Sequence, residues 1–166
     1  MKKANYNLEE IFAMRIQHLL ETEKEYLNYF EKLSGTATIK ELNASLSPER
    51  SEQSNHVSRL QLIVDTMESS STANSDLLST AILKELKKIV ASKSKPSLLK
   101  DVQILTVLKS VYAFKSAAYS SLQVIAEKLQ LEQPALLLEQ SLEDSGNNMA
   151  YLIQIERNVI YPQFKS

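Results

Sequence analysis

Apolar side chains recur along this 166-residue chain in alternating steps of three and four residues, the spacing that lines one face of an α-helix. Two glycines and four prolines are too few for the many tight turns of an all-β protein. The pattern predicts helices over about residues 8–33, 38–67, 76–91 and 98–131, and a last helix that has Pro134 near its first turn and ends before Tyr161. The expected fold class is therefore all-α.

Helix-capping residues stand at two of these predicted starts. Asn7 with Glu10 can cap the first helix, and Thr38 with Glu41 has the spacing of a capping box for the second. Pro48 falls inside the second predicted helix, where proline removes a backbone hydrogen bond and clashes with the preceding turn. We expect that helix to kink or break there.

The predicted connections suggest how the helices are arranged. A short loop at residues 34–37 makes the first two helices antiparallel neighbours, whereas the polar stretch 68–75 and the short helix after it are long enough to cross the molecule. With 43% hydrophobic residues, a chain of this length can close one core. We predict a single domain over residues 1–166, a ferritin-like antiparallel four-helix bundle with one additional short helix in the crossover.

Polar residues interrupt the inward-facing seam of each long predicted helix near its middle. Burying one charge costs several kcal/mol unless it is paired, so agreement among four helices indicates a polar layer inside the bundle. Lys115 is the only charged member of a seam that is otherwise apolar from Ile104 to Leu129. The polar core layer is predicted to consist of Glu23, Glu49, Glu52, His56, Tyr112, Lys115 and Asp144.

Carboxylates and histidines that project inward from four helices are the ligands of di-iron and di-manganese sites in bundle proteins. Glu23, Glu52 and His56 are the candidate metal ligands of this chain. A di-metal site normally has more carboxylates than these. A buried polar network that fixes the helix register is therefore favoured, and binding of iron or manganese stays open as the alternative.

Several short motifs occur in a fixed order along nearly the whole chain. They are Asn7-Leu8-Glu9-Glu10-Ile11-Phe12, Glu23-Lys24, Glu52, His56-Val57-Ser58-Arg59-Leu60, and the group Ala117, Tyr119, Leu122, Ala126, Glu127 and Leu129. Together they resemble the YciE/YciF-like ferritin-like proteins of bacteria, a group whose biochemical role is poorly defined. The resemblance implies a ferritin-like fold and a stress-related role.

The chain departs from that family pattern where a metal site would lie. A pair of glutamates on the third long helix is replaced by Tyr112 and Lys115, and Glu49 stands in place of a histidine. Further departures are His18, Leu20 and Met149. The resemblance therefore implies a degenerate metal site. The ammonium of Lys115 can supply the positive charge that stabilises Glu23 and Glu52 in place of a metal, which predicts an internal salt bridge.

Charge and composition narrow the function further. Nineteen Lys and Arg against twenty Asp and Glu give a net charge of -1, so no global field favours nucleic acid or a membrane as a partner. The absence of cysteine excludes disulfides and thiolate chemistry. No apolar run reaches the roughly 20 residues of a membrane span, and we expect a cytoplasmic protein.

Three function classes remain after these exclusions. Without a Gly-rich phosphate loop, an HExxH motif or a nucleophile elbow, a classical enzyme is not expected. We favour a non-catalytic bundle protein that needs no cofactor and self-associates, with a dimer preferred. The alternatives are a protein that binds iron or manganese, and an adaptor that binds a protein through its basic segment. That segment reads most simply as a solvated surface and contains Lys84, Lys87, Lys88, Lys93, Lys95 and Lys100.

Overall fold

The structure is a computed structural model that describes residues 7–47, 50–67 and 76–164. Every regular element in these ranges is helical, which confirms the all-α class. The helices are α1 (Leu8–Leu33), α2 (Lys40–Leu46), α3 (Gln53–Asp65), α4 (Leu77–Ala91), α5 (Leu98–Lys128) and α6 (Glu132–Ile155), followed by a π-helical turn (Glu156–Ile160) and a 3-10 turn (Tyr161–Gln163).

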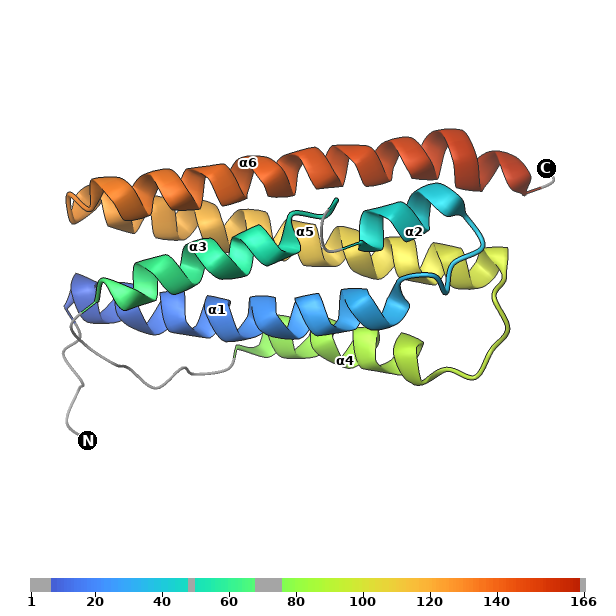
Figure 1. Cartoon of the computed structure of the whole chain (residues 1–166), viewed down its shortest axis with the longest axis horizontal. Coiled ribbons are helices and arrows are strands. Elements are labelled where there is room, and N and C mark those ends of the chain that lie inside the picture. The colour runs from blue at the N-terminus through green and yellow to red at the C-terminus, as the bar shows by residue number, and fades with distance from the viewer. Residues whose placement is uncertain (1–6, 48–49, 68–75, 165–166) are drawn as a thin grey trace.

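The helices lie side by side along the long axis of the molecule (Figure 1). α1 and α6 run in one direction, and α3 and α5 run in the other. α1 packs against α3 and α5, and α6 packs against the same two helices, so each of these contacts joins antiparallel neighbours. α4 packs outside this group against α1 and α5. Its place in the chain, between α3 and α5, makes it part of the connection that crosses from one end of the molecule to the other.

The first helix is capped as its sequence predicts, and α2 is not. The Asn7 side chain accepts a hydrogen bond from the Glu10 backbone N–H at 2.8 Å, and the Glu10 carboxylate accepts one from the Asn7 N–H. The capping box expected at Thr38 is wrong, because the N-cap residue of α2 is Ile39, whose side chain has no hydrogen-bond acceptor. Asp101 on α5 accepts from the backbone N–H groups of Thr38 and Ile39 instead, at 2.9 and 3.0 Å.

The second predicted helix is two helices in the structure. α2 ends at Leu46 and α3 begins at Gln53, so the interruption expected from proline is a full break. Pro48 and Glu49 themselves lie outside the described residues. Glu52, just before α3, has a left-handed backbone with φ of 56°, and the side-chain amide of Asn148 on α6 donates to the Ser51 carbonyl at 3.1 Å. The break therefore has its own backbone geometry and its own tertiary hydrogen bond.

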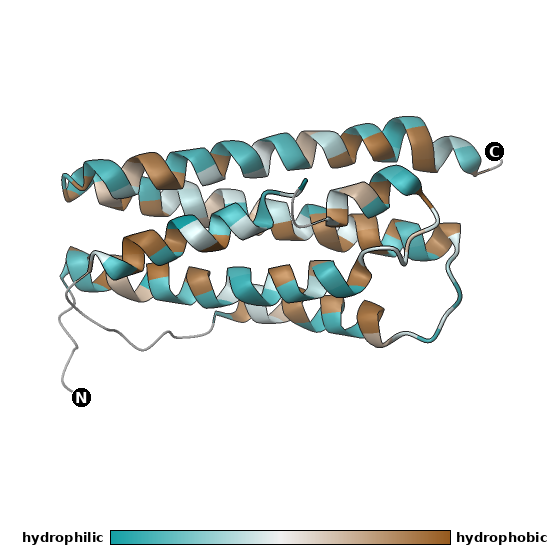
Figure 2. Cartoon of the chain, viewed as in Figure 1, coloured by the Kyte–Doolittle hydropathy of each residue, from teal (hydrophilic) through white to brown (hydrophobic). Residues whose placement is uncertain are grey.

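The apolar core is divided into two clusters along the long axis. One cluster gathers around Phe12, Leu60 and Leu122, and the other around Phe30, Leu108 and Leu152. Figure 2 shows hydrophobic and hydrophilic residues alternating along the helices. On α1 and on α5 a charged residue, Glu23 or Lys115, stands in the sequence between the residues of the two clusters. The core thus leaves a layer for polar side chains near the middle of the molecule.

Within the described ranges, none of the helices combines the length and the apolar character that a membrane crossing requires.

Candidate functional site

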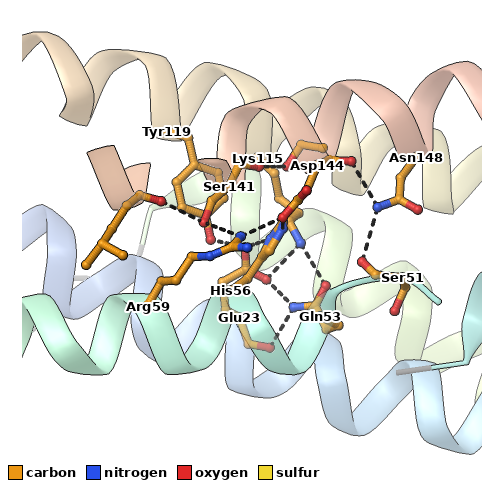
Figure 3. A network of polar contacts seen from close by, with 12 residues as sticks. Glu23, Ser51, Gln53, His56, Arg59, Lys115, Tyr119, Ser141, Asp144 and Asn148 are labelled. Atoms are coloured by element: carbon orange, nitrogen blue, oxygen red, sulfur yellow. Dashed lines mark hydrogen bonds and ion pairs between the residues drawn. The ribbon is translucent and has the colours of Figure 1, made fainter. Parts of the chain in front are cut away.

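α5 carries Lys115 into the layer between the two apolar clusters. Its side chain has no exposed surface, and its Nζ atom lies 3.0 Å from Oε2 of Glu23 on α1. The Glu23 side chain is equally buried. The internal salt bridge predicted for Lys115 therefore forms with Glu23 (Figure 3).

Two uncharged residues complete the hydrogen bonding of this ion pair. The side-chain amide of Gln53, at the start of α3, accepts from Lys115 Nζ at 2.7 Å through its oxygen. Its nitrogen donates to the Glu23 carboxylate and, at 3.2 Å, to the Glu23 backbone carbonyl. The Tyr119 hydroxyl, one helical turn beyond Lys115, donates to Glu23 Oε1 at 2.6 Å. Glu23 is thus bound from α3 and α5 at once.

His56 lies between the buried carboxylate and a second one nearer the surface. Its Nδ1 atom is 3.5 Å from Glu23 Oε1, and its Nε2 atom is 3.5 Å from Oδ2 of Asp144 on α6. Asp144 is paired with Arg59, whose Nη1 atom lies 2.5 Å away. Within the described part of the chain, neither ring nitrogen of His56 has a hydrogen-bond partner. We refer to Glu23, Gln53, His56, Lys115, Tyr119 and Asp144 as the polar centre.

The charges of the polar centre depend on one another. Burial alone would raise the pKa of the Glu23 carboxyl, because a buried anion loses its hydration. The ammonium of Lys115, with smaller effects from His56 and Tyr119, outweighs burial and lowers that pKa from 4.5 to about 2. Burial lowers the pKa of Lys115, and Glu23 opposes that shift. The carboxylate therefore stays ionised inside the protein because the lysine is beside it.

The pKa values of His56 and Tyr119, whose rings lie beside the ion pair, are shifted in the directions that keep both side chains uncharged. Burial and the charge of Lys115 lower the pKa of His56, while Glu23 and Asp144 act in the opposite direction. Burial and the neighbouring Glu23 raise the pKa of the Tyr119 hydroxyl well above its usual range, so it remains a donor. Gln53, His56 and Tyr119 therefore surround the buried Glu23–Lys115 ion pair as uncharged groups, and Asp144 is paired with Arg59 at the edge of the polar centre.

The structure brings together only some of the residues predicted for this layer. Glu23, His56 and Lys115 meet, and Asp144 lies at the edge of the group. Tyr112 is buried and lies under Lys115, whose Nζ atom is 5.2 Å from its ring centre. Glu52 is partly exposed and pairs with the neighbouring Asn55, so it does not share in the salt bridge expected for it. Glu49 lies outside the described residues.

A metal site needs several ligating side chains close together. Across residues 7–47, 50–67 and 76–164, no three His, Asp or Glu side chains lie close enough together to bind one metal ion. Glu23, Glu52 and His56, the three ligands suggested by the sequence, are therefore not gathered into one cluster. Lys115, Gln53 and Tyr119 already occupy the hydrogen-bonding positions of the Glu23 carboxylate.

Three contributors to the site were not expected from the sequence. Gln53 stands three residues before His56 and so shares a helix face with it, but its amide gave no sign that it would bridge Lys115 and Glu23. Tyr119 stands four residues after Lys115, which places it on the same face of α5 and was the available signal. Arg59 stands three residues after His56 and reaches Asp144 on another helix. Only the fold reveals that last contact.

A second polar group lies near the surface, where the start of α4 meets α1. His18 Nε2 is 2.6 Å from Oδ2 of Asp76, and the Ser79 hydroxyl donates to the same oxygen at 2.9 Å. Asp76 also caps α4 by accepting from the Ser79 backbone N–H. Burial acts to raise the pKa of Asp76, but these hydrogen bonds and His18 lower it. We call His18, Asp76 and Ser79 the α1–α4 junction.

The basic segment is mostly solvent-exposed, with one exception. Lys84, Lys87, Lys88, Lys93 and Lys95 are exposed, and Lys88 pairs with Glu85 at 2.5 Å. Lys100 is only 8% exposed, so including it in a solvated basic surface was wrong. It lies in the first turn of α5, directly before the buried Asp101.

Comparisons with known proteins bear on the whole fold. Residues 7–161 match a domain of unknown function, DUF892. The stress protein YciF of E. coli has a similar structure, with a TM-score of 0.80, 19% sequence identity, and coverage of 95% of this chain and 97% of that one. YcfI, a putative structural protein from Rhodopseudomonas palustris, gives a TM-score of 0.78, 16% identity, and coverage of 92% and 97%. At these identities the likeness shows the fold alone. No curated protein matches the chain.

Proposed function

The chain belongs to the DUF892 family, as its resemblance to YciE/YciF-like proteins indicated, and we propose that it is a non-catalytic ferritin-like bundle protein whose centre is held by an ion pair. In this proposal Lys115 replaces the metal of a ferritin-like site. The names of the two similar structures, a stress protein and a putative structural protein, support a structural role under stress rather than catalysis.

The arrangement of the helices supports the ferritin-like part of the proposal. α1 and α3 form one antiparallel pair, α5 and α6 form another, and α3 and α5 run in the same direction. A long connection containing α4 joins the two pairs. Ferritin-like folds have such a four-helix bundle with one long crossover.

The observation that carries the proposal is the contact between Lys115 Nζ and Glu23 Oε2 at 3.0 Å in a site with no exposed surface. A fixed ammonium beside a carboxylate neutralises it and repels a metal cation from the same oxygen. The donors present therefore do not fit a di-metal site. Groups that are paired and buried in this way stabilise a particular helix register and offer no reacting atom to a substrate.

One observation favours the alternative that the protein binds iron or manganese. Both nitrogens of the buried His56 lack a hydrogen-bond partner within the described residues, and each is 3.5 Å from a carboxylate oxygen. Buried imidazole nitrogens are normally satisfied. A small cation bound between His56 and one of these carboxylates would satisfy one of them.

Metal titration distinguishes the two functions. Native mass spectrometry of purified protein, loaded without oxygen with iron(II) or manganese(II), should find no bound metal in the natural protein. The Lys115→Glu variant removes the ammonium and adds a carboxylate beside Glu23, so it should gain metal, and adding Glu23→Gln should abolish that gain. Stoichiometric metal in the natural protein that is lost in a Glu23→Ala/His56→Ala variant would overturn the proposal, whether or not Lys115→Glu folds.

Self-association is part of the proposed scaffold role. Leu77 and Leu78, at the start of α4, are 92% and 59% exposed, which leaves apolar surface for a second copy of the chain. Light scattering should give the mass of a dimer, and a Leu77→Glu/Leu78→Glu variant should give that of a monomer. A monomeric mass for the natural protein at all concentrations would contradict this part of the proposal.

A further inference from the structure

A cavity of about 590 Å³ lies between α1, α5 and the first turn of α4, away from the polar centre. Its wall is largely apolar and includes Met14, Leu19, Leu78, Phe114 and Leu122. Cavities that bind small molecules fall in this size range and combine an apolar wall with a few polar groups. None of the residues of the polar centre lines this cavity. Its occupancy is therefore independent of the ion pair, although Leu78 is shared with the surface proposed for self-association.

The polar groups of the cavity are Arg15, His18, Asp76 and Ser121. Asp76 is already engaged, because Oδ1 accepts from the Ser79 N–H at 2.7 Å and Oδ2 lies 2.6 Å from His18 Nε2. Arg15 is exposed and donates from Nη1 to the Ser121 hydroxyl at 3.2 Å, which links α1 to α5 across the cavity. None of the described carboxylates lies within 4.0 Å of Arg15. A guanidinium without a carboxylate partner thus stands beside an apolar wall.

The serine, histidine and aspartate at the α1–α4 junction do not form a hydrolytic triad. In a triad the histidine binds the serine through one ring nitrogen and the carboxylate through the other. Here Ser79 and Asp76 both approach Nε2 of His18, at 3.3 and 2.6 Å. Ser79 is only 1% exposed, so its hydroxyl does not face the cavity as a nucleophile would. Binding, and not hydrolysis, is the activity that this cavity can support.

We propose that the cavity binds an unbranched fatty acid from solution. Its carboxylate pairs with the Arg15 guanidinium, which can bind a carboxylate through two parallel hydrogen bonds. Its hydrocarbon tail lies against Met14, Leu78 and Phe114, the apolar wall residues that keep exposed surface, and removes that surface from water. The wall is formed by α1, α5 and the first turn of α4, and the single guanidinium accounts for one anionic group.

Isothermal titration calorimetry with dodecanoate, kept below the concentration at which it forms micelles, tests the proposal on the full chain. We expect saturable binding of one molecule per chain. Arg15→Glu reverses the charge at the head group and should weaken binding at least about tenfold, which corresponds to about 1.4 kcal/mol. Ala117→Trp places an indole at an exposed position of the cavity wall and should abolish binding.

The matched control is Ala81→Trp, another exposed alanine, which lines a different cavity between α4 and α5. This variant should bind dodecanoate as the natural protein does. The absence of saturable binding would overturn the proposal, as would equal binding by the natural protein, Arg15→Glu and Ala117→Trp. Equally tight binding of dodecanol, which lacks the anionic group, would overturn the role of Arg15. Binding seen only in the presence of lipid vesicles would identify a membrane surface as the partner instead.

Discussion

The polar centre and the α1–α4 junction each place a histidine beside a carboxylate, but at different depths. In the centre, His56, Glu23 and Lys115 have no exposed surface, whereas the His18 and Asp76 side chains at the junction are 19% and 42% exposed. A charge in water needs no protein partner. A buried charge does, because it has lost its hydration. Pairing is therefore obligatory in the centre and optional at the junction.

The same difference explains how the groups are held. Glu23 is bound by side chains from two other helices, so every bond to it also fixes the position of a helix. Asp76 is bound by Ser79, three residues away on its own helix, and by His18 on α1. The centre should accordingly determine the stability of the whole fold, whereas the junction should mainly determine how α4 is attached to α1.

The largest effect is expected from removing the cation of the centre. Lys115→Met leaves Glu23 buried without a counter-charge, which should lower the free energy of unfolding by about 3–5 kcal/mol. Urea unfolding followed by circular dichroism measures this loss. The Glu23→Gln/Lys115→Met double variant buries no charge and should be more stable than the single variant. A single variant as stable as the double one would show that the ion pair does not support the centre.

Acid should weaken the centre through Glu23. The folded protein lowers the pKa of Glu23 from 4.5 to about 2, so the ionised carboxylate contributes stability above about pH 4.5. That contribution should be lost as pH falls towards about 2, by an amount on the order of 3 kcal/mol.

Urea midpoints measured at several pH values below about 4.5 follow this loss. The Glu23→Gln/Lys115→Met variant lacks the carboxylate and should lose less stability over the same window. His56 adds a separate loss, because its lowered pKa disfavours the protonated folded state as pH falls below the ordinary value of 6.5. An identical decline in the natural protein and the double variant below about pH 4.5 would exclude Glu23 as its cause.

Removing the hydroxyl groups of the two buried tyrosines of α5 should change stability less, and by different amounts. Tyr119 donates to the ionised Glu23, and hydrogen bonds to charged groups contribute about 1.5–3 kcal/mol, so Tyr119→Phe should cost that amount. The Tyr112 hydroxyl has no hydrogen-bond partner within the described residues, so Tyr112→Phe should be close to neutral. Thermal and urea unfolding of the two variants, measured side by side, check this order. Equal losses would contradict the role given to Tyr119.

The smallest effect is expected at the junction. His18→Ala removes a partly exposed contact with Asp76 and should cost about 0.2–1 kcal/mol, with the difference shrinking at high salt. Asp76 keeps its hydrogen bonds with Ser79 in this variant, so the cap of α4 is retained. Urea unfolding at low and high salt measures the change. A loss as large as that of Lys115→Met would remove the distinction between the two regions.

The sequence revealed the parts of this account that depend on local patterns. The capping residues Asn7 and Glu10 predicted the start of α1, and the apolar seam predicted the buried position of Lys115, because its neighbours in the seam face the core. The pairing of Lys115 with Glu23 followed from their similar heights on two helices. The match to the DUF892 family and the likeness to YciF then agree with the all-helical fold.

Contacts between segments that are far apart in the chain could not be predicted from local sequence patterns. Asp101 replaces the cap expected from Thr38, although the two residues are far apart in the chain. Glu52 was expected in the layer, but the break before α3 gives it a left-handed backbone and turns that part of the chain out of helical register. Helical spacing predicts which way a side chain faces only where the helix is continuous. It therefore could not predict the orientation of the residues around the break.

A crystal structure of the natural protein grown with manganese(II) tests the central claim most directly, because anomalous scattering locates the metal. The account predicts no anomalous peak beside Glu23 and His56, and Lys115 Nζ within hydrogen-bonding distance of the Glu23 carboxylate. A manganese peak bound by Glu23 and His56, with Lys115 displaced from the carboxylate, would contradict it.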